Sequence, residues 1–183
     1  MKNIDKTGMK GIVELKLYDA EGRAKSLFQP NKVWDMLNKL FKADVRIPFI
    51  TGVWTKTSVV YNTVTTAGLS ECAKLLGNIA ADPISHMAIG IGTGGTTALN
   101  SEITTGGGAR ASVVPTSETT TSSGDTVQSV HTFTFTGTFA VTEEGLFNAA
   151  SNGDLIAYRT FSVVNVANGD SLQITHKIVL SAV

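Results

Sequence analysis

The sequence predicts a mainly β fold: an antiparallel, jelly-roll-like β-sandwich with one or two short helices and an N-terminal hairpin-helix extension. Three observations lead to it. Glycine accounts for 18 of the 183 residues, and threonine, a β-branched residue that suits a pleated sheet, is concentrated in the second half of the chain. Short apolar or alternating runs separated by Gly, Asn and Asp turns recur along that half, as a sandwich requires. The length is enough for one compact core.

The N-terminal part predicts a hairpin followed by a helix. Apolar and polar residues alternate over residues 11–19, as in a half-buried strand, and a four-residue turn then leads into a second strand at residues 25–29. Pro30 ends that strand, and Asn31 is a favourable residue to cap a helix. A helix over residues 31–42 would carry its apolar side chains on one face, namely Val33, Trp34, Leu37, Leu40 and Phe41.

The middle of the chain predicts an extended segment, a second helix and a buried strand. Residues 50–62 are rich in Val, Thr, Trp and Tyr and favour extended structure. Residues 67–76 have helical spacing, and Gly77 with Asn78 ends the helix. The nearly continuous apolar run at residues 84–91 is typical of a strand covered on both faces. The residues that we expect on the buried face of the helix are Leu69, Cys72, Ala73 and Leu76.

The C-terminal part predicts a succession of strands joined by explicit turns. Alternation in residues 126–139 and 171–180 places apolar side chains on one face of each strand, and we expect these two faces to share a core. Residues 155–164 are apolar on both sides, which indicates a central strand. The strands expected in this part are residues 109–119, 126–139, 145–150, 155–163 and 171–180.

Charge divides the chain into two parts although the net charge is zero. Residues 1–56 contain 11 Lys and Arg against 6 Asp and Glu, whereas residues 57–183 contain 4 against 9. We therefore predict a docking segment at residues 1–56 and a β-sandwich module at residues 57–183 that folds without it. The module has only 13 charged residues in 127, which indicates that partner subunits cover part of its surface.

The docking segment supplies the candidate interaction residues. A helix as short as residues 31–42 is not stable alone, so its apolar face, Val33, Trp34, Leu37, Leu40 and Phe41, must cover another surface. The neighbouring Lys32, Lys39 and Lys42 favour an acidic partner, such as the negative part of a second copy. The sequence therefore predicts a homo-oligomer with head-to-tail contacts.

No pattern predicts an enzyme or a bound cofactor. Residues 90–95 fit G-x-G-x-x-G, but no crossover helix follows to bind a dinucleotide. Glu143 and Glu144 form the only paired carboxylate; adjacent strand residues point to opposite faces, so we expect a turn rim rather than an acid–base pair. Cys72 has no activating neighbour in sequence.

We expect no metal, membrane or nucleic acid as a ligand or partner. His86, His131 and His176 lack the spacing of metal ligands. No apolar run approaches the roughly 18–20 residues of a membrane helix, and the charged first ten residues do not fit a signal peptide, so we expect a cytoplasmic product. The basic residues of the N-terminal part are scattered, which does not favour nucleic-acid binding.

Six strings between about residue 61 and the C-terminus are more specific than composition. They are NTVTTAGL at residues 62–69, SHMAIGIGTG at 85–94, ALNSEI at 98–103, TEEGLFNAA at 142–150, LIAYRTF at 155–161 and DSLQIT at 170–175. These strings resemble those of small structural proteins of tailed bacteriophages. His176 departs from the resemblance, because those proteins often carry an aromatic residue near that position.

The resemblance implies a non-enzymatic virion protein, made in the host cytoplasm, that assembles or reinforces the particle as capsid decoration, neck, or tail or baseplate component. Its partners would be other copies of itself and neighbouring virion proteins. The alternative is a host-surface or carbohydrate-binding module of a tail fibre. Such sites usually use exposed aromatic residues on loops, and the glycine-rich loops here contain none.

Overall fold

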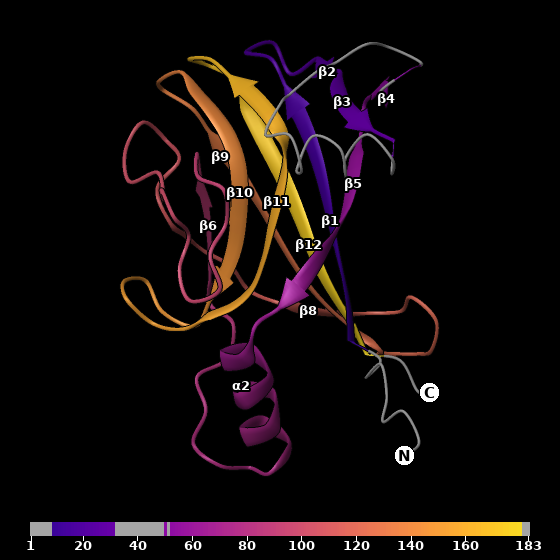
Figure 1. The fold of residues 1–183 in the computed structure, drawn as a ribbon, viewed down its shortest axis with the longest axis vertical. Helices are drawn as coiled ribbons and strands as arrows, with labels where there is room; N and C mark the ends of the chain where they lie inside the picture. Colours follow the sequence, from indigo (N-terminus) through magenta and orange to yellow (C-terminus); the bar gives the residue numbers. More distant parts are fainter. Residues whose placement is uncertain (1–8, 32–49, 51, 181–183) are drawn as a thin grey trace.

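The computed structural model describes residues 9–31, 50 and 52–180, and these form a curled antiparallel sheet with one helix and a small second sheet (Figure 1). The predicted mainly β, sandwich-like fold is confirmed. The strand order is β7-β6-β10-β11-β5-β1-β12-β9-β8, and β2 pairs with β1. The strands are β1 (Met9–Tyr18), β2 (Ala24–Lys25), β5 (Ser58–Val64), β6 (His86–Gly90), β7 (Ala111–Ser112), β8 (Thr116–Glu118), β9 (Thr126–Thr134), β10 (Phe139–Phe147), β11 (Leu155–Val166) and β12 (Ser171–Leu180).

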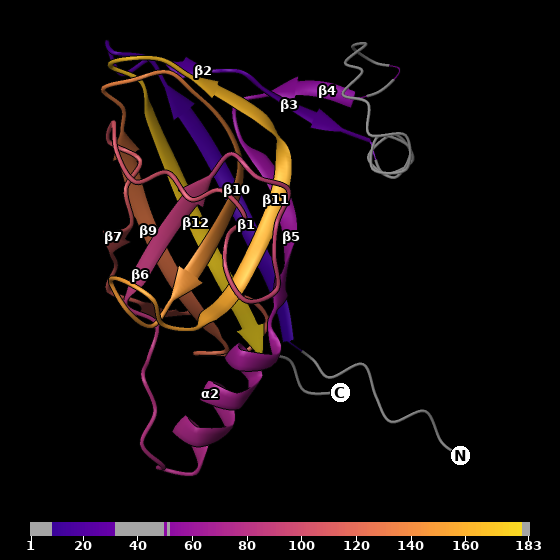
Figure 2. The ribbon, with the colours of Figure 1, turned by 60° about the vertical axis from the view of Figure 1, so that its left-hand side comes forward.

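The sheet curls into two layers that enclose the core. Strand β5 passes from one layer to the other, because Ser58–Asn62 pair with β1 whereas Thr63 and Val64 pair with β11. On the opposite side, the two edge strands β7 and β8 follow each other in the chain with only Val113, Val114 and Pro115 between them. Figure 2 shows β6, β10 and β11 in front of β9, β12 and β1.

The core follows from the alternation in the sequence. Val13, Leu15 and Leu17 of β1 are buried, and their neighbours are more exposed. The two strand faces that we expected to share a core do so, since Phe133 and Leu172 belong to one buried cluster. Strand β11 is central as predicted, with β10 on one side and β5 on the other.

The N-terminal hairpin is shorter than the sequence predicts. The turn after β1 is present, with Gly22 at φ 77°, but only Leu17 and Tyr18 pair with β2. The hairpin ends there because β5 occupies the same edge of β1 over residues 11–15. The chain then forms a second sheet from β3 (Leu27–Pro30) and β4 (Gly52–Thr55), which we call the ribbon.

Helix α2 (Thr66–Leu76) begins one residue before the predicted segment and ends at the predicted residue, but it does not have the predicted buried face. The Oγ1 atom of Thr65 caps it by accepting from the Gly68 N–H group at 3.0 Å, and the Gly77 N–H group donates to the Ala73 carbonyl at its end. The first turn of the helix lies against β11, because a Cβ atom at Gly68 would lie 2.1 Å from the Ile156 carbonyl oxygen. The helix then projects from one end of the sandwich (Figures 1 and 2). Its buried residues are Gly68 and Glu71, whereas Leu69, Ala73 and Leu76 are exposed and Cys72 is half-buried.

Several predicted strands have different bounds in the structure. The strand expected at residues 126–139 ends at Thr134, and β11, expected at residues 155–163, continues to Val166. Residues 109–119 form the short strands β7 and β8, because the chain bends between them at Val113, Val114 and Pro115. The strand expected at residues 145–150 is the end of β10, which begins at Phe139.

The boundary predicted at residue 56 does not separate the strands of the main sheet. Strand β1 comes before that boundary, yet it lies between β5 and β12 and pairs with both. Its ten residues are all in register with β12. The β-sandwich is therefore built from both predicted parts of the chain.

Candidate interaction surfaces

Glu143 holds the glycine-rich loop that follows β6. Its carboxylate is fully buried and accepts hydrogen bonds from four backbone N–H groups, those of Gly92 at 3.2 Å, Gly94 at 2.8 Å, Asn100 at 3.4 Å and Ser101 at 2.9 Å. The expectation of a turn rim is therefore wrong for this residue. The carboxylate satisfies backbone donors that the loop leaves unpaired, which makes its role structural.

The glycines of this loop are required by the approach of Glu143. A Cβ atom at Gly90 would lie 2.4 Å from Glu143 Oε1, and one at Gly92 would lie 2.6 Å from the same atom. Gly94 has a φ of 88°, a backbone conformation that glycine adopts without steric cost. The G-x-G-x-x-G pattern therefore lets a loop close over a buried carboxylate.

Glu144, the second residue of the pair, points into the core and binds His176. Neither side chain has any exposed surface, and Glu144 Oε2 lies 3.0 Å from His176 Nδ1. The amide nitrogen of Asn62 donates to Nε2 on the other side of the ring. Because an amide nitrogen can only donate, Nε2 accepts and the ring donates its Nδ1 proton to Glu144. The ring is thus held from both sides within the core.

Arg110 ties together two of the loops that cover the outer face of β10. Its guanidinium group forms two hydrogen bonds with Glu102, at 3.0 and 2.7 Å, and donates to the backbone carbonyls of Ala149 and Asn152. It also lies 3.7 Å above the ring of Phe147. A bidentate pair of this kind fixes geometry as well as charge, so this cluster organises loops.

The remaining residues considered for chemistry are dispersed. His86 contacts Ser85, and burial lowers the pKa of His131, which packs against Phe133. Burial and the neighbouring Glu71 raise the pKa of the Cys72 thiol, which disfavours the reactive thiolate. Among the residues that the structure describes, no three His, Cys, Asp or Glu side chains are placed to hold a metal ion together.

An apolar surface lies at the end of the sandwich from which α2 projects. We call it the helix pole and define it by Leu69, Leu75, Leu76 and Ile79, all of which are exposed. Leu76 exposes 90% of its surface. Leu69, Leu75 and Leu76 lie on α2, and Ile79 follows it in the chain. Isolated exposed apolar residues are ordinary, whereas several that gather at one end of a molecule are typical of an interaction surface.

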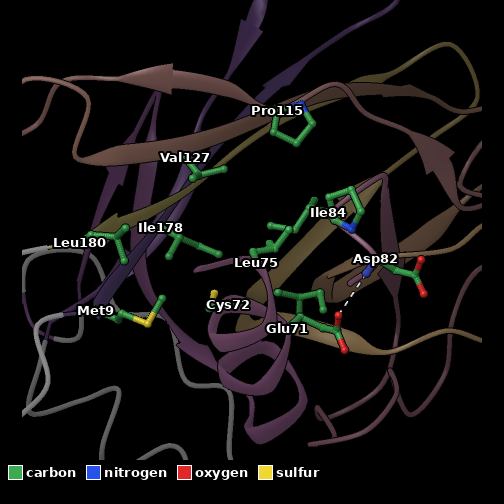
Figure 3. Close-up of a pocket in the computed structure, with 12 residues that line it drawn as sticks. Met9, Glu71, Cys72, Leu75, Asp82, Ile84, Pro115, Val127, Ile178 and Leu180 are labelled. Atoms are coloured by element: carbon green, nitrogen blue, oxygen red, sulfur yellow. Dashed lines mark hydrogen bonds between the residues drawn. The ribbon is translucent and has the colours of Figure 1, made fainter. Parts of the chain in front are cut away.

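A cavity of about 250 Å³ adjoins the helix pole (Figure 3). Figure 3 shows Leu75 rising from α2 into it, with Ile178 and Ile84 nearby. At its edge, Glu71 accepts the Asp82 N–H group at 3.1 Å and pairs with Lys74 at 2.6 Å. These contacts lower the pKa of Glu71, through Lys74 first. The site therefore combines an apolar interior with a polar rim, which carries the Glu71–Lys74 pair and the exposed Asp82.

The ribbon presents a second apolar surface, at the opposite end of the sandwich (Figures 1 and 2). Its inner side chains, Leu27 and Phe28, are buried. On the neighbouring strand, Val53 and Trp54 are exposed, and Trp54 exposes 51% of its surface. The Trp54 ring meets Phe28 edge to face, with 5.5 Å between the ring centroids.

The interaction residues predicted from the sequence lie outside the described residues. This applies to the helix expected at residues 31–42 from residue 32 on, with its apolar face Val33, Trp34, Leu37, Leu40 and Phe41 and its lysines Lys32, Lys39 and Lys42. Sequence reasoning missed the helix pole. The available signal was an excess of apolar residues at the end of the helix, where Leu75, Leu76 and Ile79 exceed what one buried face requires.

Comparison with protein-family models, curated proteins and solved structures found no match for the chain. No helix within the described ranges is long and apolar enough to cross a membrane.

Proposed function

We propose that this chain is a non-enzymatic structural protein of a tailed-phage virion, which assembles or reinforces the particle through copies of itself and neighbouring virion proteins. The single observation that carries the proposal is the helix pole. An exposed apolar helix beside an apolar cavity is suited to binding another protein surface. The stations open to such a protein are capsid decoration, neck, and tail or baseplate.

The resemblance to phage structural proteins supports the proposal because its strings form one connected structural unit. Glu143, from the TEEGLFNAA string, holds the glycines of SHMAIGIGTG. The string NTVTTAGL includes Thr65 and Gly68, at the start of α2, and this part of the helix packs on the start of β11, in the string LIAYRTF. There the Thr65 Oγ1 hydroxyl donates to the backbone carbonyls of Leu155 and Ile156. Shared strings that interlock in this way are expected from a shared fold.

Electron microscopy of labelled particles tests the proposal. Antibodies against the purified protein should decorate intact virions of the phage that encodes it at one repeated position, and that position identifies the station. Virions that contain none of the protein, by labelling and by mass spectrometry of purified particles, would overturn the proposal.

The exposed aromatic side chains favour one alternative function. Trp54 and Tyr61 are both more than half exposed, and aromatic faces of this kind stack against sugar rings in carbohydrate-binding proteins. A host-surface binding module would then bind defined glycans in an array screen and lose that binding in Trp54→Ala. An assembly protein would bind no glycan and would still decorate the particle.

A further inference from the structure

The ribbon and the helix pole are complementary surfaces at opposite ends of one molecule. The ribbon is anchored to the sandwich through Leu27, which belongs to the main core cluster, but it leaves the indole of Trp54 exposed. The cavity beside the helix pole is lined mainly by apolar side chains. Contact between the two surfaces would therefore bury apolar area on both.

Charge favours contact between a ribbon and a helix pole over contact between two ribbons or between two helix poles. Trp54 is followed by Lys56, which is exposed, and the ribbon belongs to the part of the chain that has 11 basic residues against 6 acidic ones. At the rim of the cavity Asp82 is exposed, whereas Glu71 is buried and paired with Lys74. The helix pole belongs to the part of the chain with 4 basic residues against 9 acidic ones. Complementary charge orients such an encounter.

We propose that the helix pole of one copy binds the ribbon of a second copy, with Trp54 entering the cavity beside Leu75. This inference rests on the proposed function, because it supplies the contact through which copies assemble. The contact is heterologous: each copy offers one surface and uses the other. Repetition generates a ring if the rotation closes and a filament if it does not.

A mixing experiment with two variants tests the proposal. Trp54→Ala removes the anchor of the ribbon and leaves the pole intact, whereas Leu75→Glu places a charge in the cavity and leaves the ribbon intact. Each variant alone should associate at least tenfold more weakly than the wild-type chain in light scattering over a concentration series, because aromatic anchors dominate such interfaces. A one-to-one mixture should form dimers and nothing larger, because only one competent contact remains.

Two matched controls and one chemical probe accompany the mixture. Tyr61→Ala removes an exposed aromatic side chain from β5, and Val130→Glu adds a charge to an exposed position on β9; both should associate like the wild type. Cys72 is the only cysteine of the chain and lines the cavity. Its alkylation should slow as the wild-type chain associates and should not slow in Trp54→Ala.

Each other outcome overturns the proposal. Association of Trp54→Ala alone with wild-type affinity indicates that two poles pair, and association of Leu75→Glu alone indicates that two ribbons pair. A wild-type chain that stays monomeric at every concentration excludes self-docking. The labelling of virions tests the proposed function independently of this contact. If the particles are decorated but the mixing experiment fails, the proposed function stands and the contact between the helix pole and the ribbon is wrong.

Discussion

Gly11 leaves room for the side chain of Asn62 to cross a strand. Asn62 lies on β5 and reaches His176 on β12, although β1 separates those two strands. A Cβ atom at Gly11 would lie 0.9 Å from Asn62 Oδ1. The absence of a side chain at this one position therefore permits a polar contact between strands that are not neighbours.

We expect Gly11→Ala to lower the free energy of unfolding by about 1–3 kcal/mol, the usual cost of overpacking a core. Asn62→Ala removes the clash but leaves His176 without its donor, so the double variant should lose less stability than the sum of the two single variants. Chemical denaturation of all three variants measures this coupling. Gly137→Ala, where the new methyl group meets only the edge of Phe139, is the control, and equal losses at both glycines would contradict the explanation.

Asp125 organises the loop before β9. Its carboxylate accepts hydrogen bonds from the N–H groups of Thr120, Thr121 and Ser122, at 2.7–2.8 Å. These backbone donors, Ser122 first, hold the pKa of Asp125 well below its usual range. Because the charged form is favoured in the folded state, its stabilising effect is complete above the unfolded pKa of about 4 and is lost as the pH falls below it.

The variant Asp125→Asn should therefore melt at a lower temperature than the wild type at pH 7, and the difference should shrink as the pH falls from about 4 toward 2. Thermal melts at a series of pH values provide the measurement. Asp154→Asn, at another turn, is a matched control, because it shares none of these three donors. A difference that is the same at pH 3 and pH 7 would show that the charge of Asp125 does not matter.

Glu143 and Glu144 show the limit of residue-level prediction. The sequence favours a solvated turn for two adjacent carboxylates, because burying a charge without partners is costly. The partners come from distant residues: the loop at residues 92–101 for Glu143, and His176 for Glu144. A register shift between Val141 and Glu143 accompanies them in β10. No local pattern reports donors that lie more than 30 residues away.

At the scale of elements, α2 shows that bounds are easier to predict than orientation. Thr65, Gly77 and Asn78 are local end signals, and the helix begins and ends beside them. The apolar stripe was assigned to the core because amphipathic helices usually bury it. In the structure Gly68 packs so closely on β11 that a Cβ atom would lie 2.1 Å from the Ile156 carbonyl, and this contact at the first turn sets the direction of the helix.

The cap of α2 should be important to stability and to the position of the helix pole. Thr65→Ala removes the acceptor for the Gly68 N–H group and the hydroxyl that donates to Leu155 and Ile156. We expect a loss of about 0.5–2 kcal/mol in the free energy of unfolding. Thr65→Ser should retain most of the stability, and Thr66→Ala, at the exposed next position, should have little effect. Equal losses at residues 65 and 66 would contradict this role.

The recurring turns made the positions of most strands predictable. The sequence did not predict which of these strands pair with each other. Asn152 and Gly153, and Gly169 in the next turn, adopt the positive φ angles that the turn residues favour. Strand β12 accordingly has the predicted bounds. Its partner β1 lies at the other end of the chain, and alternation does not identify which of several amphipathic strands becomes a neighbour.

At the scale of the whole molecule, several of the strings that resemble phage proteins supply interior contacts. Glu143 and Phe147 are buried, and Arg110 is bound to Glu102. In the proposed function, contacts with neighbouring virion proteins would be made by surface residues. The exposed apolar residues of α2 and of the ribbon would then decide the station, and the ribbon lies outside the resembling strings.

The position of β1 within the main sheet predicts that the chain cannot be divided at residue 56 into parts that fold independently. Removing residues 1–56 takes β1 out of the sheet and exposes the hydrogen-bonding edges of both β5 and β12, together with the core side chains that Val13, Leu15 and Leu17 cover. Residues 57–183 alone should therefore show no cooperative thermal unfolding. This differs from the sequence-based expectation that they fold without the N-terminal part.

A peptide that spans residues 9–25 provides the decisive control, because it contains β1 and β2 and lacks the ribbon. Added to residues 57–183, it should restore a cooperative transition in circular dichroism, since ten residue pairs with β12 and five with β5 re-form at the vacant position. The same peptide with Val13 and Leu15 replaced by Asp should not, because a charge would then enter the core. If residues 57–183 unfold cooperatively without any peptide, the sheet does not depend on β1 and the module boundary at residue 56 is correct.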